Sequence, residues 1–139
     1  MKAVLPAHAD GVVIGADTFL YFRGHVIGKP KTLAHACRML KELSGKSHWV
    51  YTGLCLRDIR SGCLRTGFAK SKVAFRCPSP EAIARYVVRV HALDKAGGYA
   101  AQEDRGELIA KIEGSRTNVV GLPLELLRRE LRFFKKNIC

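Results

Sequence analysis

Residues 47–76 read SHWVYTGLCLRDIRSGCLRTGFAKSKVAFR. Residues that favour β-strands, among them Trp49, Val50, Tyr51 and Phe68, are frequent in both halves of this stretch, and the segment IRSG separates the two halves. Two strand-forming runs joined by a short turn predict a long antiparallel hairpin. The sequence therefore places a β-sheet at the centre of the fold.

Helices are predicted on both sides of this hairpin. Residues 31–45, KTLAHACRMLKELSG, carry apolar side chains at helical spacing, with Gly45 as a C-terminal cap. Residues 79–90, SPEAIARYVVRV, form a second helix with Ser79 as its N-cap. The last helix is LELLRRELRFFKK, residues 124–136. Its predicted apolar face consists of Leu124, Leu127, Leu131 and Phe134.

Shorter strands complete the pattern. Residues 11–16, GVVIGA, predict a short buried strand, and FLYF with HVIG predict a small hairpin across residues 19–28. Residues 107–114 predict another strand, followed by a loop at SRTN, residues 115–118. We therefore expect one α/β domain of the mixed α+β kind over residues 1–139. It should have a central mixed sheet with flanking helices and a long antiparallel hairpin.

Composition limits the functional classes. The chain has 139 residues, with 24 Lys and Arg against 12 Asp and Glu, a net charge of +12 that favours polyanionic partners. No apolar run approaches the roughly 20 residues of a membrane span, so we expect no membrane partner. The N-terminal sequence lacks the long apolar region of a secretory signal, and a cytoplasmic location is expected.

Asp17 and Lys29 are the first candidate functional residues. Asp17 and Thr18 directly follow the strand predicted at residues 11–16, a position where functional groups commonly gather. Lys29 lies twelve positions after Asp17, beyond the small hairpin. A carboxylate and an ammonium placed in this way form either a surface ion pair or two walls of a phosphate site.

A second group of candidates lies in DKAGGYAAQED, residues 94–104. Asp94 and Lys95 supply opposite charges, and Gly97 allows backbone amides to approach an anion closely. Gln102 carries an amide that is able to read a nucleobase edge. Carboxylates and lysines are also the groups that metal-assisted attack on a phosphate needs.

Five blocks of the sequence together carry a resemblance to a known family. They are GADT, GKP, RMLKELSGKSHWVYTG, DKAGGYAAQ and IEGSRTNVVGLPLELL. In this order and spacing they resemble the Maf family of nucleoside triphosphate pyrophosphatases, from about Val12 to Leu131. The resemblance implies a Maf/ITPase-like fold and hydrolysis of a nucleoside triphosphate to the monophosphate and diphosphate, assisted by Mg²⁺ or Mn²⁺.

The resemblance also assigns roles to residues. It implies that Asp17 is the proton acceptor that activates water and shares in binding the divalent metal, and that Lys29 is the cation on the phosphate side. Thr18 and Gln102 match positions that set base preference, in the combination that acts on dTTP and UTP. The loop positions with a structural and phosphate-facing role are Asp94, Lys95 and Gly97.

One block of the family has no match. Maf proteins begin with a strand and a loop reading S-x-S-P-R-R, whereas this chain begins MKAVLPAHADG. The N-terminal strand, loop and helix of the family are therefore expected to be absent. That absence would leave a sheet edge open beside Asp17, which favours a homodimer because unpaired edges pair with other chains.

These observations leave three hypotheses. The first is a pyrophosphatase that removes unwanted nucleotides, with activity impaired by the missing segment. The second is a Maf remnant that binds nucleotides as a regulatory module without turnover. The third is a basic nucleic-acid-binding domain, which no RNP-type aromatic motif, GXXG loop or zinc-ligand spacing supports.

Overall fold

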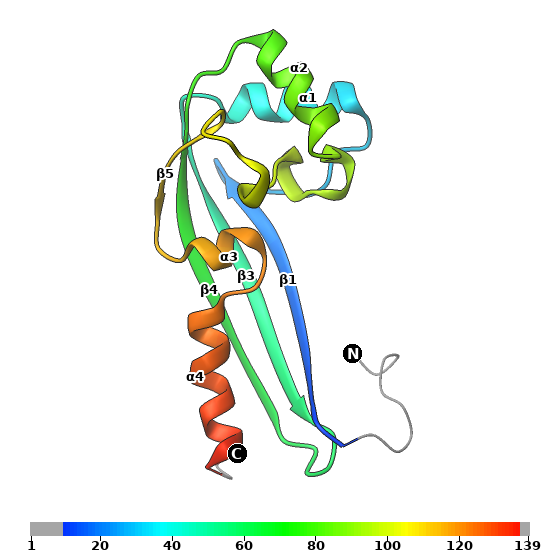
Figure 1. The fold of residues 1–139 in the computed structure, drawn as a ribbon, viewed down its shortest axis with the longest axis vertical. Helices are drawn as coiled ribbons and strands as arrows, with labels where there is room; N and C mark the ends of the chain where they lie inside the picture. The colour runs from blue at the N-terminus through cyan, green and yellow to red at the C-terminus, as the bar shows by residue number, and fades with distance from the viewer. Residues whose placement is uncertain (1–9, 137–139) are drawn as a thin grey trace.

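The structure is a computed structural model that describes residues 10–136 of the chain (Figure 1). At its centre is a sheet with the strand order β2-β1-β3-β4-β5. The strands are β1 Val12–Phe22, β2 His25–Ile27, β3 Ser47–Asp58, β4 Leu64–Phe75 and β5 Ile109–Glu113. The mixed α+β class is confirmed, and β3 and β4 form the long hairpin predicted for residues 47–76.

The sheet itself differs from the prediction of a mixed sheet. Every neighbouring pair of strands in the described part of the chain is antiparallel. A parallel pair requires a crossover that returns the chain in its original direction. Here short turns join β1 to β2 and β3 to β4, and the helix between β2 and β3 leads the chain back antiparallel to β1.

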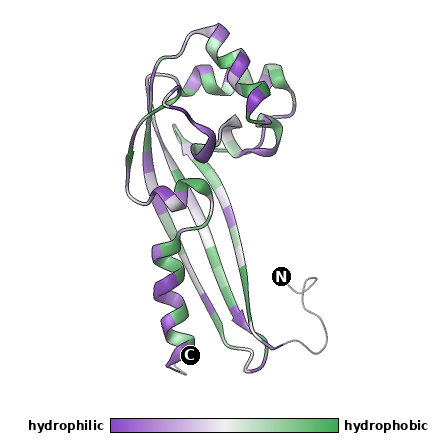
Figure 2. Cartoon of the chain, in the orientation of Figure 1, coloured by the Kyte–Doolittle hydropathy of each residue, from purple (hydrophilic) through white to green (hydrophobic). Residues whose placement is uncertain are grey.

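Burial alternates along the long strands and gives the sheet two unlike faces. In β3 every even-numbered residue from His48 to Leu56 is buried, and no odd-numbered residue is. Figure 2 shows both hydrophobic and hydrophilic residues along these strands. This period of two is typical of an antiparallel sheet with one covered face. The other face stays partly exposed and carries an aromatic pair, Phe19 stacked on Tyr51 with ring centroids 5.4 Å apart.

The helices cover the buried face. The α-helices in the described part of the chain are α1 Leu33–Leu43, α2 Pro80–Arg89, α3 Arg116–Val120 and α4 Leu124–Lys135. In Figure 1, α1 and α2 lie together at one end of the sheet, whereas α3 and α4 run along it. Ser79 caps α2 as predicted, since its hydroxyl accepts a hydrogen bond from the Ala82 amide. None of these helices is long and apolar enough to cross a membrane.

The strand predicted at residues 11–16 is wrong in length and burial. Val12–Phe22 forms one continuous strand, and none of residues 12–16 is buried. Pairing with β3 extends from Val12 to Tyr21, so the strand continues without a break through Asp17 and Thr18. Asp17 therefore lies in the middle of β1, opposite Gly53, and not after its end.

Two predictions near the C-terminal end of the described chain are also corrected. The segment SRTN is not a loop: Ser115 caps the short helix α3 through the Asn118 amide. In α4, Leu126 and Leu127 are the buried leucines, whereas Leu124 is 37% exposed. Leu127, Leu131 and Phe134 belong to the apolar face as predicted. Leu126 takes the place of Leu124, because its side chain packs against Gly67 of β4, where the absent side chain makes room.

The edge of β1 is unpaired over most of its length. In the part of the chain that the structure describes, β2 pairs only with Leu20–Phe22, so residues 12–19 have a ladder partner on the β3 side alone. Unpaired backbone groups along such an edge are able to pair with another chain. The expectation of a homodimer formed at this edge stays a prediction.

His48 is a buried histidine at the centre of the main core. Only 1% of it is exposed, its Nε2 lies 2.8 Å from the Tyr99 hydroxyl, and its ring meets Phe75 edge to face. Burial lowers the pKa of His48 from its ordinary 6.5 to about 4. Because the folded state resists protonation of this ring, the unfolded chain binds more protons between these two pH values.

The free energy of unfolding should therefore decrease as the pH falls from about 6.5 to about 4. We expect His48 to contribute a loss of roughly 1 kcal/mol per pH unit, about 3 kcal/mol in total. Urea unfolding at pH 7, 6 and 5 measures this slope. His48→Gln should flatten it, whereas His25→Gln, at an exposed position, should leave it at the parental value. Equal slopes in the parent and His48→Gln would contradict the assignment.

Candidate functional site

A cavity of about 230 Å³ lies beside the middle of β1. Its walls come from β1, the segment after β2, the turns that follow α2, and α3. It brings together residues that are far apart in the sequence, and most of the predicted candidates are among them. These are Asp17, Thr18, Lys29, Asp94, Lys95 and Gln102.

Asp17 and Thr18 reach this cavity from one strand. Neighbouring residues of a strand point to opposite faces of a sheet, and Thr18 is the one on the helix-covered face, opposite Thr52. Asp17 is exposed and lies where the edge of β1 is unpaired. Lys29 enters from the exposed segment that links β2 to α1. Asp17 and Lys29 are thus both among the residues that line one cavity.

The DKAGG segment forms another wall through two consecutive 3-10 turns, Ala92–Asp94 and Ala96–Gly98. Asp94 and Lys95 line the cavity, and the Lys95 ammonium lies 4.0 Å from a carboxylate oxygen of Glu103. Gly97 does not line it. Its amide donates a hydrogen bond to the Gly28 carbonyl at 2.9 Å, which ties this turn to the segment that carries Lys29.

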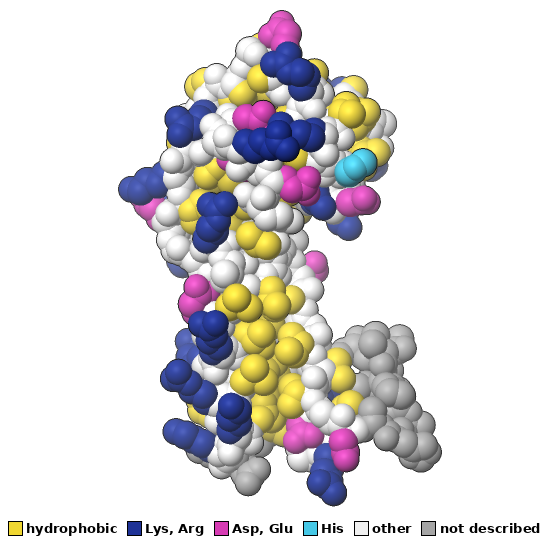
Figure 3. Space-filling model, in the orientation of Figure 1, with side chains coloured by type: hydrophobic (Ala, Val, Ile, Leu, Met, Phe, Trp, Pro, Cys, Tyr) yellow, Lys and Arg dark blue, Asp and Glu magenta, His cyan; other side chains and the backbone are white. Residues whose placement is uncertain are grey.

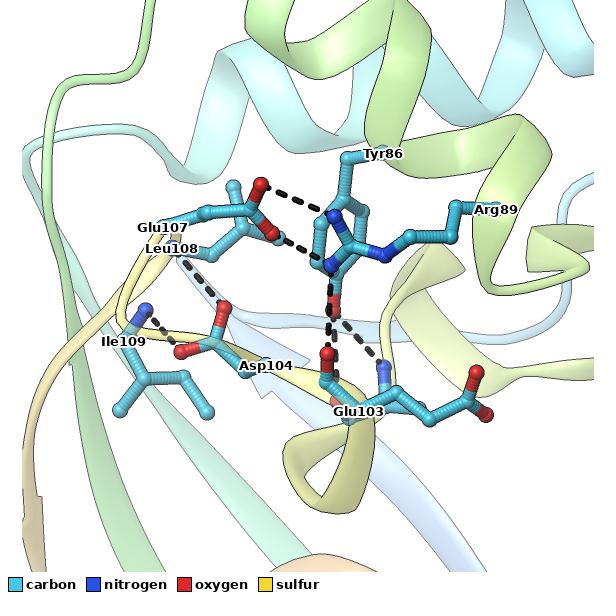
Figure 4. A network of polar contacts seen from close by, with 8 residues as sticks. Tyr86, Arg89, Glu103, Asp104, Glu107, Leu108 and Ile109 are labelled. Atoms are coloured by element: carbon cyan, nitrogen blue, oxygen red, sulfur yellow. Dashed lines mark hydrogen bonds and ion pairs between the residues drawn. The ribbon is translucent and has the colours of Figure 1, made fainter.

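Gln102 is presented by the 3-10 turn Ala101–Glu103, which a network of polar contacts holds in place (Figure 4). On the α2 side, the Tyr86 hydroxyl donates to the Ala100 carbonyl at 3.3 Å and accepts from the Ala100 amide at 3.2 Å. Arg89 of the same helix donates to the Glu103 carbonyl at 3.2 Å. The backbone on both sides of Gln102 is therefore fixed to α2.

Ion pairing and backbone hydrogen bonds complete this network. The Arg89 guanidinium binds both carboxylate oxygens of Glu107, and the hydrogen bond between them lowers the pKa of the Glu107 carboxyl. Asp104 accepts hydrogen bonds from the backbone amides of Leu108 and Ile109 at 3.0 and 3.2 Å. Figure 4 shows these groups around the segment that leads from Glu103 to Ile109, the first residue of β5. The base-reading candidate is thus carried by a rigid segment.

A polar network that sequence reasoning missed lies beneath the cavity. The Thr18 and Thr52 hydroxyl oxygens lie 2.8 Å apart, and the Thr52 hydroxyl donates to the Asn118 carbonyl at 3.2 Å. Thr52 and Asn118 are both fully buried. One signal was available: in the alternating pattern of β3, Thr52 shares the buried phase with His48, Val50 and Leu54.

A larger hollow of about 590 Å³ lies along the far half of the long strands. Its lining is mostly apolar, and it contains no Lys, Arg or His. Figure 3 shows hydrophobic side chains in a band beside α4, whose own surface carries basic side chains. Since an anionic ligand needs cations, the smaller cavity is the better phosphate site. The two hollows share Ala16 and Asp17.

The cavity therefore defines a class of protein before any comparison. Two lysines, two acidic residues, a glutamine and a threonine line one small cavity on a mixed α+β scaffold. Such a set of groups suits an anionic, hydrogen-bonding small molecule. Comparison with protein families identifies the family within this class. The family model described as Maf-like protein matches residues 1–134, and the chain belongs to that family.

Curated relatives match most of the chain. A dTTP/UTP pyrophosphatase of Moorella thermoacetica is 42% identical over 96% of this chain and 69% of the relative. Proteins of the same name from Clostridium tetani and Thermosipho melanesiensis are 40% and 46% identical, over 85% and 82% of this chain. The match covers 62% of the length of each of these two relatives.

Gly97 provides a test of how the cavity wall is supported. Its φ is +70°, and a Cβ at this position would clash with Cδ2 of Leu20, which is buried in the core. Gly97→Ala should lower the free energy of unfolding by roughly 2–5 kcal/mol, from the strained φ and the overpacking together. Chemical denaturation measures this change.

Gly62→Ala is the matched control. Its φ of +72° is nearly the same, but nothing lies within 4 Å of the added Cβ. This variant should lose only the backbone contribution, about 1–2 kcal/mol. Equal losses in the two variants would show that Leu20 moves aside and that the contact does not constrain the wall.

Proposed function

We propose that this chain binds pyrimidine nucleoside triphosphates, dTTP and UTP, and hydrolyses them to the monophosphate and diphosphate, which removes unwanted nucleotides. The observation that carries the proposal is the convergence of Asp17, Lys29, Thr18 and Gln102 on one cavity. Membership of the Maf-like family and the names of the relatives support the same activity.

In this proposal Asp17 is the general base. Its carboxylate takes a proton from the water that attacks the α-phosphorus, and the bond to the bridging oxygen breaks as diphosphate leaves. The exposed position of Asp17 at the unpaired edge of β1 leaves it open to water. Asp17 also lines the neighbouring larger hollow.

Lys29 and Lys95 are the cations available to the phosphates. Both line the cavity, and Lys29 makes no ion pair among the described residues, whereas Lys95 lies 4.0 Å from Glu103. Asp94 lines the same wall as Lys95. We assign Lys29 to the phosphate groups and Asp94 and Lys95 to the loop that faces them, with Gly97 as the support beneath that loop.

A divalent cation such as Mg²⁺ or Mn²⁺ fits this site only together with the substrate. In the described residues no group of three or more His, Cys, Asp or Glu side chains could hold a metal. Mg²⁺ in nucleotide enzymes is commonly held by one or two carboxylates plus substrate phosphates and waters. Asp17, with Asp94 on the facing wall, provides that number of carboxylates. The cation would neutralise phosphate charge.

Slow turnover is the second candidate outcome, and the number of cations favours it. A nucleoside triphosphate carries close to four negative charges, and the described lining of the cavity offers two lysines and no arginine. Losing one preorganised donor commonly lowers turnover by ~10²–10³-fold. A chain that binds nucleotides but hydrolyses them slowly would act as a nucleotide-binding module.

The role of Asp17 is tested by pyrophosphate release. Asp17→Asn should lower the release of diphosphate from dTTP and UTP by ~10²–10⁴-fold, because it removes the general base while keeping the shape of the side chain. Asp10→Asn, at an exposed position that does not line the cavity, should keep the parental rate. Hydrolysis at the parental rate in Asp17→Asn would mean that another group activates the water.

The role of Gln102 is tested by comparing bases. The Gln102 amide both donates and accepts, as the edge of uracil or thymine requires. Gln102→Glu removes the donor and adds a negative charge, so kcat/KM for dTTP and UTP should decrease more than that for ATP and GTP. A uniform decrease for all four nucleotides would show instead that Gln102 only supports its turn.

A further inference from the structure

The network beneath the cavity determines which way the Thr18 hydroxyl points. A threonine hydroxyl has one proton, and that of Thr52 is donated to the Asn118 carbonyl, which can only accept. Thr52 therefore has no proton left for Thr18. With the Thr52 proton donated to Asn118, Thr18 is the donor and Thr52 the acceptor in the 2.8 Å contact between the two hydroxyls.

Hydrogen bonds of the Asn118 side chain hold this residue, and with it the backbone carbonyl that accepts from Thr52, in place. The Asn118 side-chain amide donates to the Val50 carbonyl at 3.1 Å and to the Ser71 hydroxyl at 3.0 Å. The Ser71 hydroxyl in turn donates to the Ser115 carbonyl at 2.9 Å. Thr52, Ser71 and Asn118 are each at most 1% exposed. The directions of these flanking hydrogen bonds are fixed, because the amide can only donate to Ser71 and the Ser115 carbonyl can only accept from it.

We propose that Thr52 is a positioning residue for base selection, which acts by fixing the polarity of the Thr18 hydroxyl. Thr52 does not line the cavity, whereas Thr18 does. With its proton committed to Thr52, Thr18 presents only oxygen lone pairs to a ligand. Thr18 is then an acceptor that selects an N–H group on the base.

This polarity separates two kinds of pyrimidine. Uracil and thymine carry a proton on N3, which an acceptor at Thr18 would bind. Cytosine has a bare N3 lone pair in the same place, so two acceptors would face each other and both would lose hydration without a hydrogen bond. The inference rests on the proposed function, and it explains how this site would prefer UTP and dTTP to CTP.

The experiment compares UTP with CTP in the parent chain, Thr52→Val and Thr52→Ser. Valine keeps the shape of threonine but cannot accept a hydrogen bond, so the Thr18 hydroxyl becomes free to donate into the cavity. We expect the preference for UTP over CTP to decrease about five- to tenfold in Thr52→Val. Serine keeps the hydroxyl and should retain the parental preference.

Two measurements report this ratio independently. One is kcat/KM for diphosphate release, and the other is the equilibrium Kd for the non-hydrolysable α,β-imido analogues of UTP and CTP, which needs no turnover. Thr66→Val is the matched control, because Thr66 is an exposed threonine of β4 that lines only the larger, mostly apolar hollow and not this cavity. It should leave both ratios unchanged.

The outcomes separate this inference from the function on which it rests. If the parent prefers UTP and Thr52→Val keeps the full preference, the role of Thr52 is overturned while the function stands. If Thr52→Ser loses as much preference as Thr52→Val, the methyl group matters and not the hydroxyl, which also overturns it. A parent that binds neither analogue, or binds both equally, contradicts the proposed function and the inference with it.

Discussion

The register between β1 and β3 is the constraint on which the candidate site depends. Asp17 lies opposite Gly53 and Thr18 opposite Thr52, so one strand sends a carboxylate to the open face and a hydroxyl to the covered face. A slip of one residue would exchange the two faces. The slip would also move Leu20 out of the core and Thr18 away from its buried partner. Hydrophobic burial and a polar contact thus enforce the same alignment.

The remaining walls of the cavity are attached to this aligned pair by short, specific contacts. The amide of Gly97 donates a hydrogen bond to the carbonyl of Gly28. The hydroxyl of Tyr86 makes hydrogen bonds with both the carbonyl and the amide of Ala100. The side chain of Asn118 joins α3 to the central strands. Functional side chains on loops therefore rest on a rigid sheet, which is the usual division between scaffold and site.

The sequence was sufficient for elements with strong local signals. The hairpin at residues 47–76 and the capped helix beginning after Ser79 are dictated by β-propensity, turn residues and capping, and the structure has both. Features that depend on distant contacts were not predicted. The continuous β1 requires a ladder with β3, and the face of α4 is set by Gly67 of another strand. No local pattern contains that information.

The same distinction applies to the candidate site. The charged residues of the cavity were found from their types and from resemblance, and the structure brings them together. Their roles stay proposals. The buried partners Thr52 and Asn118 were missed because neither carries a charge or belongs to a catalytic pattern. Only the three-dimensional arrangement reveals that a neutral hydroxyl in the core contacts a residue of the cavity wall.

The residues beneath the cavity are far apart along the chain, and this affects folding kinetics. Thr18 and Thr52 are 34 residues apart, and Thr52 and Asn118 are 66 apart. Closing loops of this size lowers the entropy of the chain before the contacts that compensate for this loss have formed. Non-local pairing therefore slows folding. The hairpin of β3 and β4 closes a far shorter loop and is free to form early. We therefore expect the candidate cavity to be among the last parts of the molecule to become native.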